Sequence, residues 1–202
     1  MVGKKLGTIG SAIMFTFGSI AVWRWIQTDM LFFALFALRD FLAAGFLFGR
    51  RKAISKCTPI QQVTAYISSC LPFLYQSSNF PLLQSVAILQ GVLVVGGFTL
   101  ATLATIELGF QMGVSPANRG KKISTGVYRF LNHPMYFGYA IAEMGVIAIN
   151  PASNALLFVI STGLYVYRAR LENQILSECN QQRSEPLSIA DRIRPVLHQS
   201  KS

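Results

Sequence analysis

The sequence predicts an all-α fold, a polytopic transmembrane bundle of about six helices, and three observations support this prediction. Of the 202 residues, 52% are hydrophobic and only 13% are charged, whereas a soluble domain carries about 25% charged residues. Apolar segments close to the length of about 20 residues that crosses a bilayer recur along the chain. Lysines and arginines gather at alternate connections between these segments, as in membrane proteins with several spans.

The expected helices are six apolar segments, and helices are the default because every backbone polar group in lipid needs an internal partner. In chain order they cover about residues 6–23, 30–48, 60–75, 82–112, 134–149 and 152–167. The first follows Lys4 and Lys5, but no small-residue cleavage site comes after it, so we expect a retained helix rather than a signal peptide. The third is short for a complete span. Only Asn150 and Pro151 separate the last two, which predicts a tight helical hairpin.

The second segment carries Arg39 and Asp40 within its apolar run. Ionisable residues at membrane depth are costly unless they are paired or face water. Adjacent residues point in different directions on a helix. We therefore expect that these two side chains do not satisfy each other alone.

The fourth segment has small residues at a four-residue step, which are Gly97, Ala101, Thr105 and Gly109. A face of this kind lets another backbone approach closely. It favours packing inside the bundle, and it also suits a homodimer seam or the wall of a cofactor site.

The basic residues predict the orientation. If all six segments span the membrane, 16 of the 18 lysines and arginines lie on one side, and Arg24 and Arg39 are the exceptions. The positive-inside rule then places both termini of this multi-pass integral membrane protein in the cytoplasm. We divide the chain into N-terminal helices (1–81), a core with the long helix, a cytoplasmic loop and the hairpin (82–180), and a cytoplasmic tail (181–202).

Composition also excludes classes of function. The three cysteines lack even pairing and metal-ligand spacing, and the only histidines are His133 and His198, which nearly excludes a multi-histidine metal site. A net charge of +10 can indicate nucleic acid, but on a chain this apolar it indicates cytoplasmic loops beside anionic lipid headgroups. We expect the lipid bilayer as a partner, with no nucleic acid and no metal.

Polar residues gather at the cytoplasmic end of the predicted hairpin. Asn132-His133-Pro134 is typical of a helix start, with Pro at the first position and Asn or His able to cap it. Such a start offers free N–H groups and a partial positive charge to an anion. Arg168 and Glu172 lie four apart on one helical face. They fit a plain exposed ion pair, or they converge with His133 on a receptor for a zwitterionic amino-acid group.

The ordered motifs of this region resemble the isoprenylcysteine carboxyl methyltransferase family and, more distantly, membrane phospholipid N-methyltransferases. The motifs are Ser124-Thr125-Gly126-Val127-Tyr128, His133-Pro134-Met135-Tyr136-Phe137-Gly138, Asn150-Pro151, and then Arg168, Glu172 and Leu176. The resemblance covers about the last third of the chain and the long helix before it. The segment 192–195 matches the family's C-terminal proline segment weakly. Asn132 and Asn173 depart from the pattern, because the family has Arg and Glu there.

The resemblance implies an enzyme that transfers a methyl group from S-adenosylmethionine to a lipid-like or prenylated acceptor, most naturally a carboxylate. The implied cofactor-binding residues are Gly126, Tyr128, Leu131, Asn132, His133, Pro134, Tyr136, Gly138 and Glu172. His133 and the helix start would meet the methionine carboxylate, and Glu172 would meet the ammonium. The implied catalytic residues are Arg168, which would orient the acceptor, with Glu172 and Asn173. The active site would lie on the C-terminal hairpin at the cytoplasmic face.

Alternatives stay open at this point. An amine or thiol acceptor would make the protein a phospholipid or small-molecule N- or S-methyltransferase. A heme-binding membrane protein needs axial ligands, for which only His133 qualifies. The departures at Asn132 and Asn173 also fit a non-catalytic membrane scaffold. Glu143, inside the fifth segment, is either a packed, protonated acid or a group of the acceptor pocket.

Overall fold

The structure is a computed structural model that describes residues 2–50, 58–77, 82–114 and 123–184. The α-helices of this part are α1 (Val2–Thr28), α2 (Leu31–Phe48), α3 (Pro59–Cys70), α4 (Gln84–Leu108), α5 (Pro134–Ile147) and α6 (Pro151–Ser184). Three short 3-10 helices join them, η1 (Leu71–Leu74), η2 (Gly109–Gln111) and η3 (Gly126–Arg129). The predicted all-α bundle of six helices is confirmed, while the family-like segment 192–195 lies outside the described residues.

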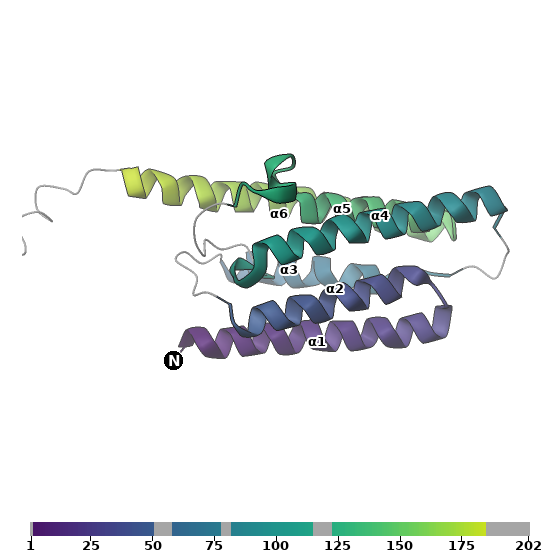
Figure 1. The fold of residues 1–202 in the computed structure, drawn as a ribbon, viewed down its shortest axis with the longest axis horizontal. Coiled ribbons are helices and arrows are strands. Elements are labelled where there is room, and N and C mark those ends of the chain that lie inside the picture. Colours follow the sequence, from purple (N-terminus) through teal and green to yellow (C-terminus); the bar gives the residue numbers. More distant parts are fainter. Residues whose placement is uncertain (1, 51–57, 78–81, 115–122, 185–202) are drawn as a thin grey trace, which may run out of the picture.

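The helices alternate in direction along one axis (Figure 1). The start of α1, the ends of α2 and α4, and the C-terminal end of α6 lie toward one end of the bundle, which we name the N-terminal end. The α1–α2 connection, the start of α4 and the α5–α6 turn lie toward the opposite end. This is the alternation that the distribution of basic residues predicted, although many of those residues lie outside the described ranges.

The helices differ in length. By length and composition, three stretches of the described residues can cross a membrane, Gly7–Thr28, Leu31–Phe48 and Gln84–Gln111. With 12 and 14 residues, α3 and α5 fall short of a hydrocarbon core of about 30 Å at about 1.5 Å per residue. With 34 residues, α6 runs well beyond the apolar segment, because the residues after Tyr167 are mostly good helix formers. Arg168 and Glu172 therefore lie inside a helix rather than at its end.

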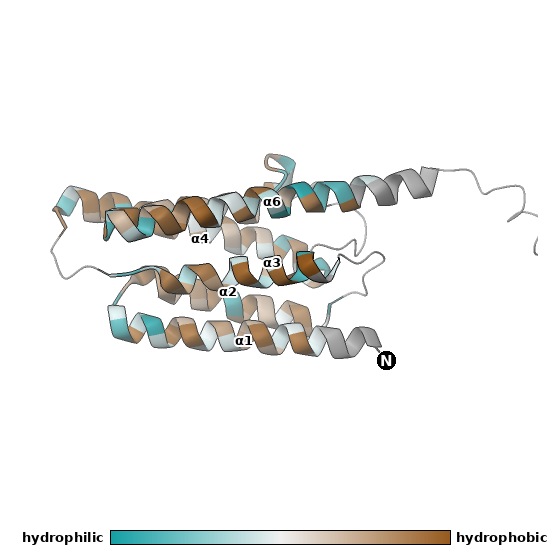
Figure 2. Cartoon of the chain, turned by 180° about the vertical axis from the view of Figure 1, so that it is seen from behind, coloured by the Kyte–Doolittle hydropathy of each residue, from teal (hydrophilic) through white to brown (hydrophobic). Residues whose placement is uncertain are grey.

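The outside of the bundle is apolar. Large hydrophobic side chains are exposed on several helices, including Phe15 on α1 (60%), Val92 on α4 (63%) and Val159 on α6 (66%). Figure 2 shows hydrophobic residues along the helices, with hydrophilic residues more frequent on α6 toward its C-terminal end. Soluble monomers rarely expose apolar surface this extensive, so this surface suits lipid.

The small-residue face of α4 packs against α5. A Cβ atom at Gly97 would meet the backbone nitrogen of Ala142, and one at Gly138 would lie 2.6 Å from the carbonyl oxygen of Gly97. Ala101 and Thr105 are fully buried on the same face. The internal packing that the sequence favoured is therefore what the structure shows, and α5 occupies the face that also suited a homodimer seam.

We expect Gly97→Ala to destabilise the protein by about 1–3 kcal/mol, the usual cost of overpacking a core. The added methyl group would meet backbone atoms of α5, which cannot rotate away as a side chain can. Gly96→Ala is the matched control, because a Cβ atom there meets nothing within 4 Å. Unfolding of both variants in detergent measures the difference, and equal stabilities would contradict the close approach of α4 and α5.

The two ionisable residues inside α2 form an ion pair. As expected, they do not satisfy each other alone, because Arg39 Nε and both carboxylate oxygens of Asp40 have no hydrogen-bond partner among the described residues. Arg39 Nη1 lies 2.8 Å from Asp40 Oδ1, and both side chains are buried. The long arginine side chain reaches its neighbour although the two Cβ directions diverge. The Arg39 guanidinium also lies over the rings of Phe36 and Tyr139, 4.9 and 4.5 Å from their centres.

Two polar residues fasten the opposite end of the bundle. Arg24, the exception to the charge pattern, donates from Nη2 to the carbonyl oxygen of Tyr75 at 2.6 Å. Asn154 is fully buried at the start of α6. Its Oδ1 accepts from the backbone N–H of Gln76, and its Nδ2 donates to the carbonyl oxygens of Gln76 and Val146. The segment after η1 is thereby joined to both α1 and the α5–α6 turn.

Candidate functional site

Glu107 positions the turn that precedes α5. Gly126 opens η3 with φ 53°, in the left-handed region that favours glycine. Both carboxylate oxygens of Glu107 lie 3.0 Å from the backbone nitrogen of Val127, and a Cβ atom at Gly126 would collide with that carboxylate. Glu107 was not among the predicted site residues, although it is the only acidic residue in segment 82–112, where an acid is costly.

Tyr128 follows in η3 and is half-buried. Burial first, and then the negative charge of Glu172, raise the pKa of Tyr128 above the ordinary value of a tyrosine. Its hydroxyl group therefore keeps its proton at neutral pH and can serve as a hydrogen-bond donor.

A polar cluster forms where the start of α5 meets α6. Glu172 Oε1 accepts from the Tyr136 hydroxyl at 2.5 Å, and Glu172 Oε2 lies 3.4 Å from His133 Nδ1. His133 Nε2 lies 3.1 Å from Asn173 Oδ1. We name these four residues the His133 cluster. The structure thus brings His133 and Glu172 together, as the tight hairpin predicted.

The start of α5 differs from the expected capped helix in one respect. Pro134 occupies the first helical turn, and His133 is the N-cap residue, but its side chain makes no capping hydrogen bond. The imidazole instead turns toward α6, where Glu172 and Asn173 contact it. Asn132 is exposed. The first N–H groups of a helix have no partner within the helix, so this end of α5 suits an anion.

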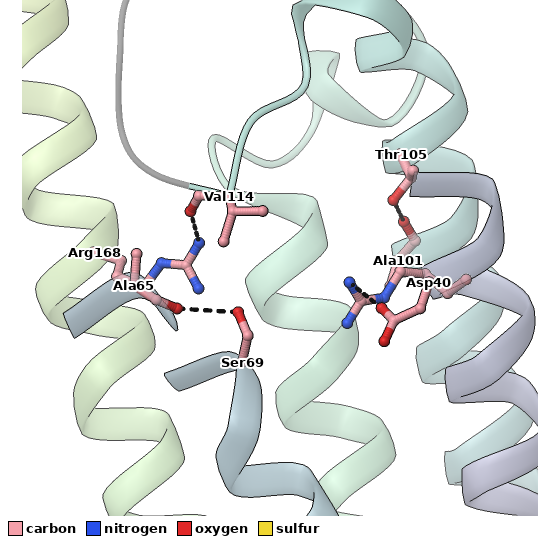
Figure 3. A network of polar contacts seen from close by, with 8 residues as sticks. Asp40, Ala65, Ser69, Ala101, Thr105, Val114 and Arg168 are labelled. Atoms are coloured by element: carbon pink, nitrogen blue, oxygen red, sulfur yellow. Dashed lines mark hydrogen bonds and ion pairs between the residues drawn. The ribbon is translucent and has the colours of Figure 1, made fainter. Parts of the chain in front are cut away.

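Arg168 points into the bundle, and the exposed ion pair with Glu172 that the spacing also allowed does not form. Its Nη1 donates to Ser68 Oγ at 2.8 Å and its Nη2 to the carbonyl oxygen of Val114 at 2.6 Å. Its guanidinium carbon lies 5.0 Å from the centre of the Tyr136 ring. Figure 3 shows Arg168 on α6 beside Val114, with Ser69 and Ala65 of α3 next to it. Among the described residues, no acid forms an ion pair with Arg168.

The remaining predicted residues divide between the two sides of α5. Leu131 is half-buried in the turn before the helix, and Pro134 is buried. Gly138 lies instead on the side that faces α4, where its backbone is close to Gly97 and Ala101. The structure therefore does not bring Gly138 to the His133 cluster, and helix packing accounts for the glycine there.

A row of aromatic rings runs from the His133 cluster into the core. The rings of His133 and Tyr136 are 5.9 Å apart, and those of Tyr136 and Tyr165 are 5.8 Å apart and nearly parallel at 8°. The Tyr165 hydroxyl donates to Glu143 at 2.6 Å, and the Tyr75 hydroxyl donates to Glu143 at 3.1 Å. The buried Glu143 carboxyl group is therefore hydrogen-bonded by two tyrosines.

We expect Gly126→Ala to disrupt the turn far more than Gly109→Ala. Both glycines have positive φ, and Gly109, with ψ −127°, lies in a region that is essentially restricted to glycine, so Gly109→Ala already carries a backbone cost of about 1–3 kcal/mol. Only at Gly126 does the new methyl group also collide with the Glu107 carboxylate, whereas the space at Gly109 is open. Thermal unfolding of the two variants isolates the collision, and equal losses would show that Glu107 does not hold the turn.

The matches to known proteins concern the half of the chain that carries this site. Residues 86–183 match the model of a protein family described as phospholipid methyltransferases. No curated protein and no solved structure matches the chain. The family match includes nearly all of α4 and α6 together with η2, η3 and α5, and thus the whole His133 cluster.

Proposed function

We propose that this chain is a membrane methyltransferase that uses S-adenosylmethionine to methylate a lipid-like acceptor, and the family match over residues 86–183 supports this activity. The observation that supports the cofactor is the His133 cluster at the start of α5. It combines a helix N-terminus and an imidazole with the Glu172 carboxylate, whose Oε2 lies 3.4 Å from His133 Nδ1. Groups that suit an anion and a group that suits a cation thus lie together, which fits the amino-acid portion of S-adenosylmethionine.

The residues present can hold this cofactor. Each carboxylate oxygen accepts about two hydrogen bonds, so Glu172 can bind an ammonium group while Tyr136 and His133 keep their contacts. The start of α5 binds the methionine carboxylate, and His133 joins it when Nε2 exchanges Asn173 for this carboxylate. Tyr128 and Leu131, both half-buried in the turn, line the adenosine side together with Tyr136.

Catalysis in this proposal depends on alignment and on exclusion of water. S-adenosylmethionine supplies a methyl group on a sulfonium, which an acceptor displaces in line. The protein holds the two reactants in one geometry, which is a large source of rate enhancement for such a reaction. Arg168 orients the acceptor from the buried side of Tyr136.

The acceptor that we favour is a carboxylate of isoprenylcysteine type. A carboxylate is ionised at pH 7 and needs no general base, and Arg168 offers it a planar two-pronged donor. A phospholipid amine is the second candidate, because the matched family is described as phospholipid methyltransferases. An amine acceptor must lose a proton first.

The experiment is methyl transfer from tritium-labelled S-adenosylmethionine into a lipid extract, with the purified protein in detergent or vesicles. A methyl ester releases volatile methanol in alkali, whereas an N-methyl group does not, so alkaline treatment separates the two acceptors. Heat-denatured protein is the control. Absence of label from every lipid, with the fold intact, would contradict the proposed function.

We also propose that both termini and the His133 cluster face the cytoplasm in a multi-pass topology. The alternation of the helices supports this, because it places the ends of α2, α4 and α6 on the same side as the N-terminus. A reporter fused to either terminus checks the orientation, and an outside signal from either fusion would contradict it.

A further inference from the structure

Two arginines face one cavity inside the bundle. The cavity measures about 30 Å³, and its lining includes Arg39 of α2, Ser68 and Ser69 of α3, Tyr139 of α5 and Arg168 of α6. A water molecule needs about 10–15 Å³ of such space, so the cavity holds about two water-sized groups. We name it the arginine cavity.

The positive charge in this cavity is not fully balanced. Arg39 is paired with Asp40, whereas the described partners of Arg168 are the neutral Ser68 and Val114. The nearby Glu143 is bonded to tyrosine hydroxyls. A buried charge without a partner of opposite sign is costly, so the cavity favours an anion.

Hydrogen-bond donors without a partner also favour an anionic ligand in the arginine cavity. Each arginine is 7% exposed, and the Nε atoms of both lack a hydrogen-bond partner among the described residues. Buried polar groups in native proteins usually have partners. Two such donors on side chains that line one cavity indicate a ligand with oxygen acceptors.

We propose that the arginine cavity binds an anionic oxygen group of the acceptor lipid, a carboxylate or a phosphate, and that Arg39 determines this selectivity together with Arg168. The identification of the ligand as the acceptor rests on the proposed function. A carboxylate would be the methyl acceptor itself, whereas a phosphate would anchor a headgroup whose amine is methylated. Tyr136 lines the cavity and also belongs to the His133 cluster, so the bound group lies next to the cofactor side.

This proposal assigns selectivity to the N-terminal helices. Arg39, Ser68 and Ser69 precede the family match at residues 86–183. The matched region supplies the His133 cluster and Arg168, while α2 and α3 supply the other side of the cavity. Figure 3 shows this division, with Asp40 of α2 and Ser69 of α3 on helices separate from the one that carries Arg168.

The test measures binding of three amphiphiles to the wild-type protein in neutral detergent without S-adenosylmethionine: dodecanoate, dodecyl phosphate and methyl dodecanoate. We expect at least one anion to bind about tenfold or more tightly than the uncharged ester, as charge-assisted hydrogen bonds allow. If only dodecanoate binds tightly, the site is selective for a carboxylate, and if only dodecyl phosphate does, it is selective for a phosphate. If both bind tightly, the site selects for negative charge. Equal binding of all three overturns the proposal.

Variants assign the selectivity to Arg39. Arg39→Lys keeps a positive charge beside Asp40 but loses the planar fork and its Nε–H, and we expect anion binding to weaken about tenfold. Arg170→Gln is the matched control, because Arg170 is exposed on α6, and it should bind as the wild type does. Unchanged anion binding by Arg39→Lys overturns the role of Arg39.

Other measurements separate this proposal from the proposed function. Affinity for S-adenosylmethionine, measured on each variant, reports whether the His133 cluster is intact. If Arg39→Lys fails to fold, the preference of the wild-type protein for the anions over the uncharged ester still tests whether the arginine cavity binds an anion. Anion selectivity without any methyl transfer would refute the methyltransferase proposal and leave the anion site standing. Methyl transfer without anion selectivity would overturn only the arginine cavity as a binding site.

Discussion

Glu172→Ala is expected to weaken the binding of S-adenosylmethionine by about 1.5–3 kcal/mol, the usual contribution of a hydrogen bond to a charged group. Glu172 accepts from Tyr136 and lies beside His133, so the variant loses the group proposed to bind the ammonium. It also leaves the Tyr136 hydroxyl without this acceptor. Calorimetric titration of the detergent-solubilised protein measures the change.

Two further variants make this result specific. Glu172→Gln keeps an oxygen that can accept from Tyr136 but removes the negative charge, so we expect a smaller loss than with alanine. Gln174→Ala is the control, because Gln174 is exposed on α6. An unchanged affinity in folded Glu172→Ala would show that Glu172 is only a surface charge.

Arg168→Ala is expected to lower the rate of methyl transfer far more than it lowers cofactor affinity. Its guanidinium lies 5.0 Å from the centre of the Tyr136 ring and is bound to Ser68 and Val114, and among the described residues no hydrogen bond or ion pair joins it to His133 or Glu172. Arg168→Lys should not fully restore the rate, because a point charge cannot replace both donors of the planar fork. Steady-state rates and binding constants for both variants check this, with thermal unfolding to monitor the fold.

Asn173→Glu tests whether residue 173 contributes to cofactor binding, as Arg168→Ala tests whether Arg168 acts on the acceptor. The amide oxygen of Asn173 contacts His133, so a carboxylate there would keep a partner for the imidazole and restore the acidic pair of the resembled family. We expect cofactor binding to hold or tighten, against some repulsion from Glu172. If Arg168→Ala abolishes cofactor binding while Asn173→Glu has no effect, Arg168 belongs to the cofactor site instead.

Local patterns in the sequence predicted the helices and the His133 cluster. Hydropathy predicted all six α-helices, and Asn150-Pro151 predicted the tight turn that brings His133 beside Glu172. These inferences succeed because they depend on residues close in the chain or on the two arms of one hairpin.

The remaining contacts depend on packing between distant segments. Ser68 and Arg168 are 100 positions apart, and no spacing rule relates them. Glu107 accepts from the backbone N–H of Val127, 20 positions further along the chain, and no pattern in the sequence predicts this contact. The ion pair of Arg39 with Asp40 depends on the long, flexible arginine side chain, because the direction of Cβ does not limit where such a side chain places its charge.

The three hydrogen bonds of Asn154 tie the start of α6 to Gln76 and Val146, so Asn154 would act as the hinge for any tilt of this helix. Arg168 lies on the same helix at a lever arm of about 21 Å, at about 1.5 Å per residue. A rotation of about 5° around this hinge would move Arg168 by about 2 Å, which exceeds the tolerance of a hydrogen bond. The contact between Arg168 and Ser68 would then open while the Asn154 bonds stay closed. A gap between α3 and α6 that opened in this way would be wider beside Arg168 than beside Asn154.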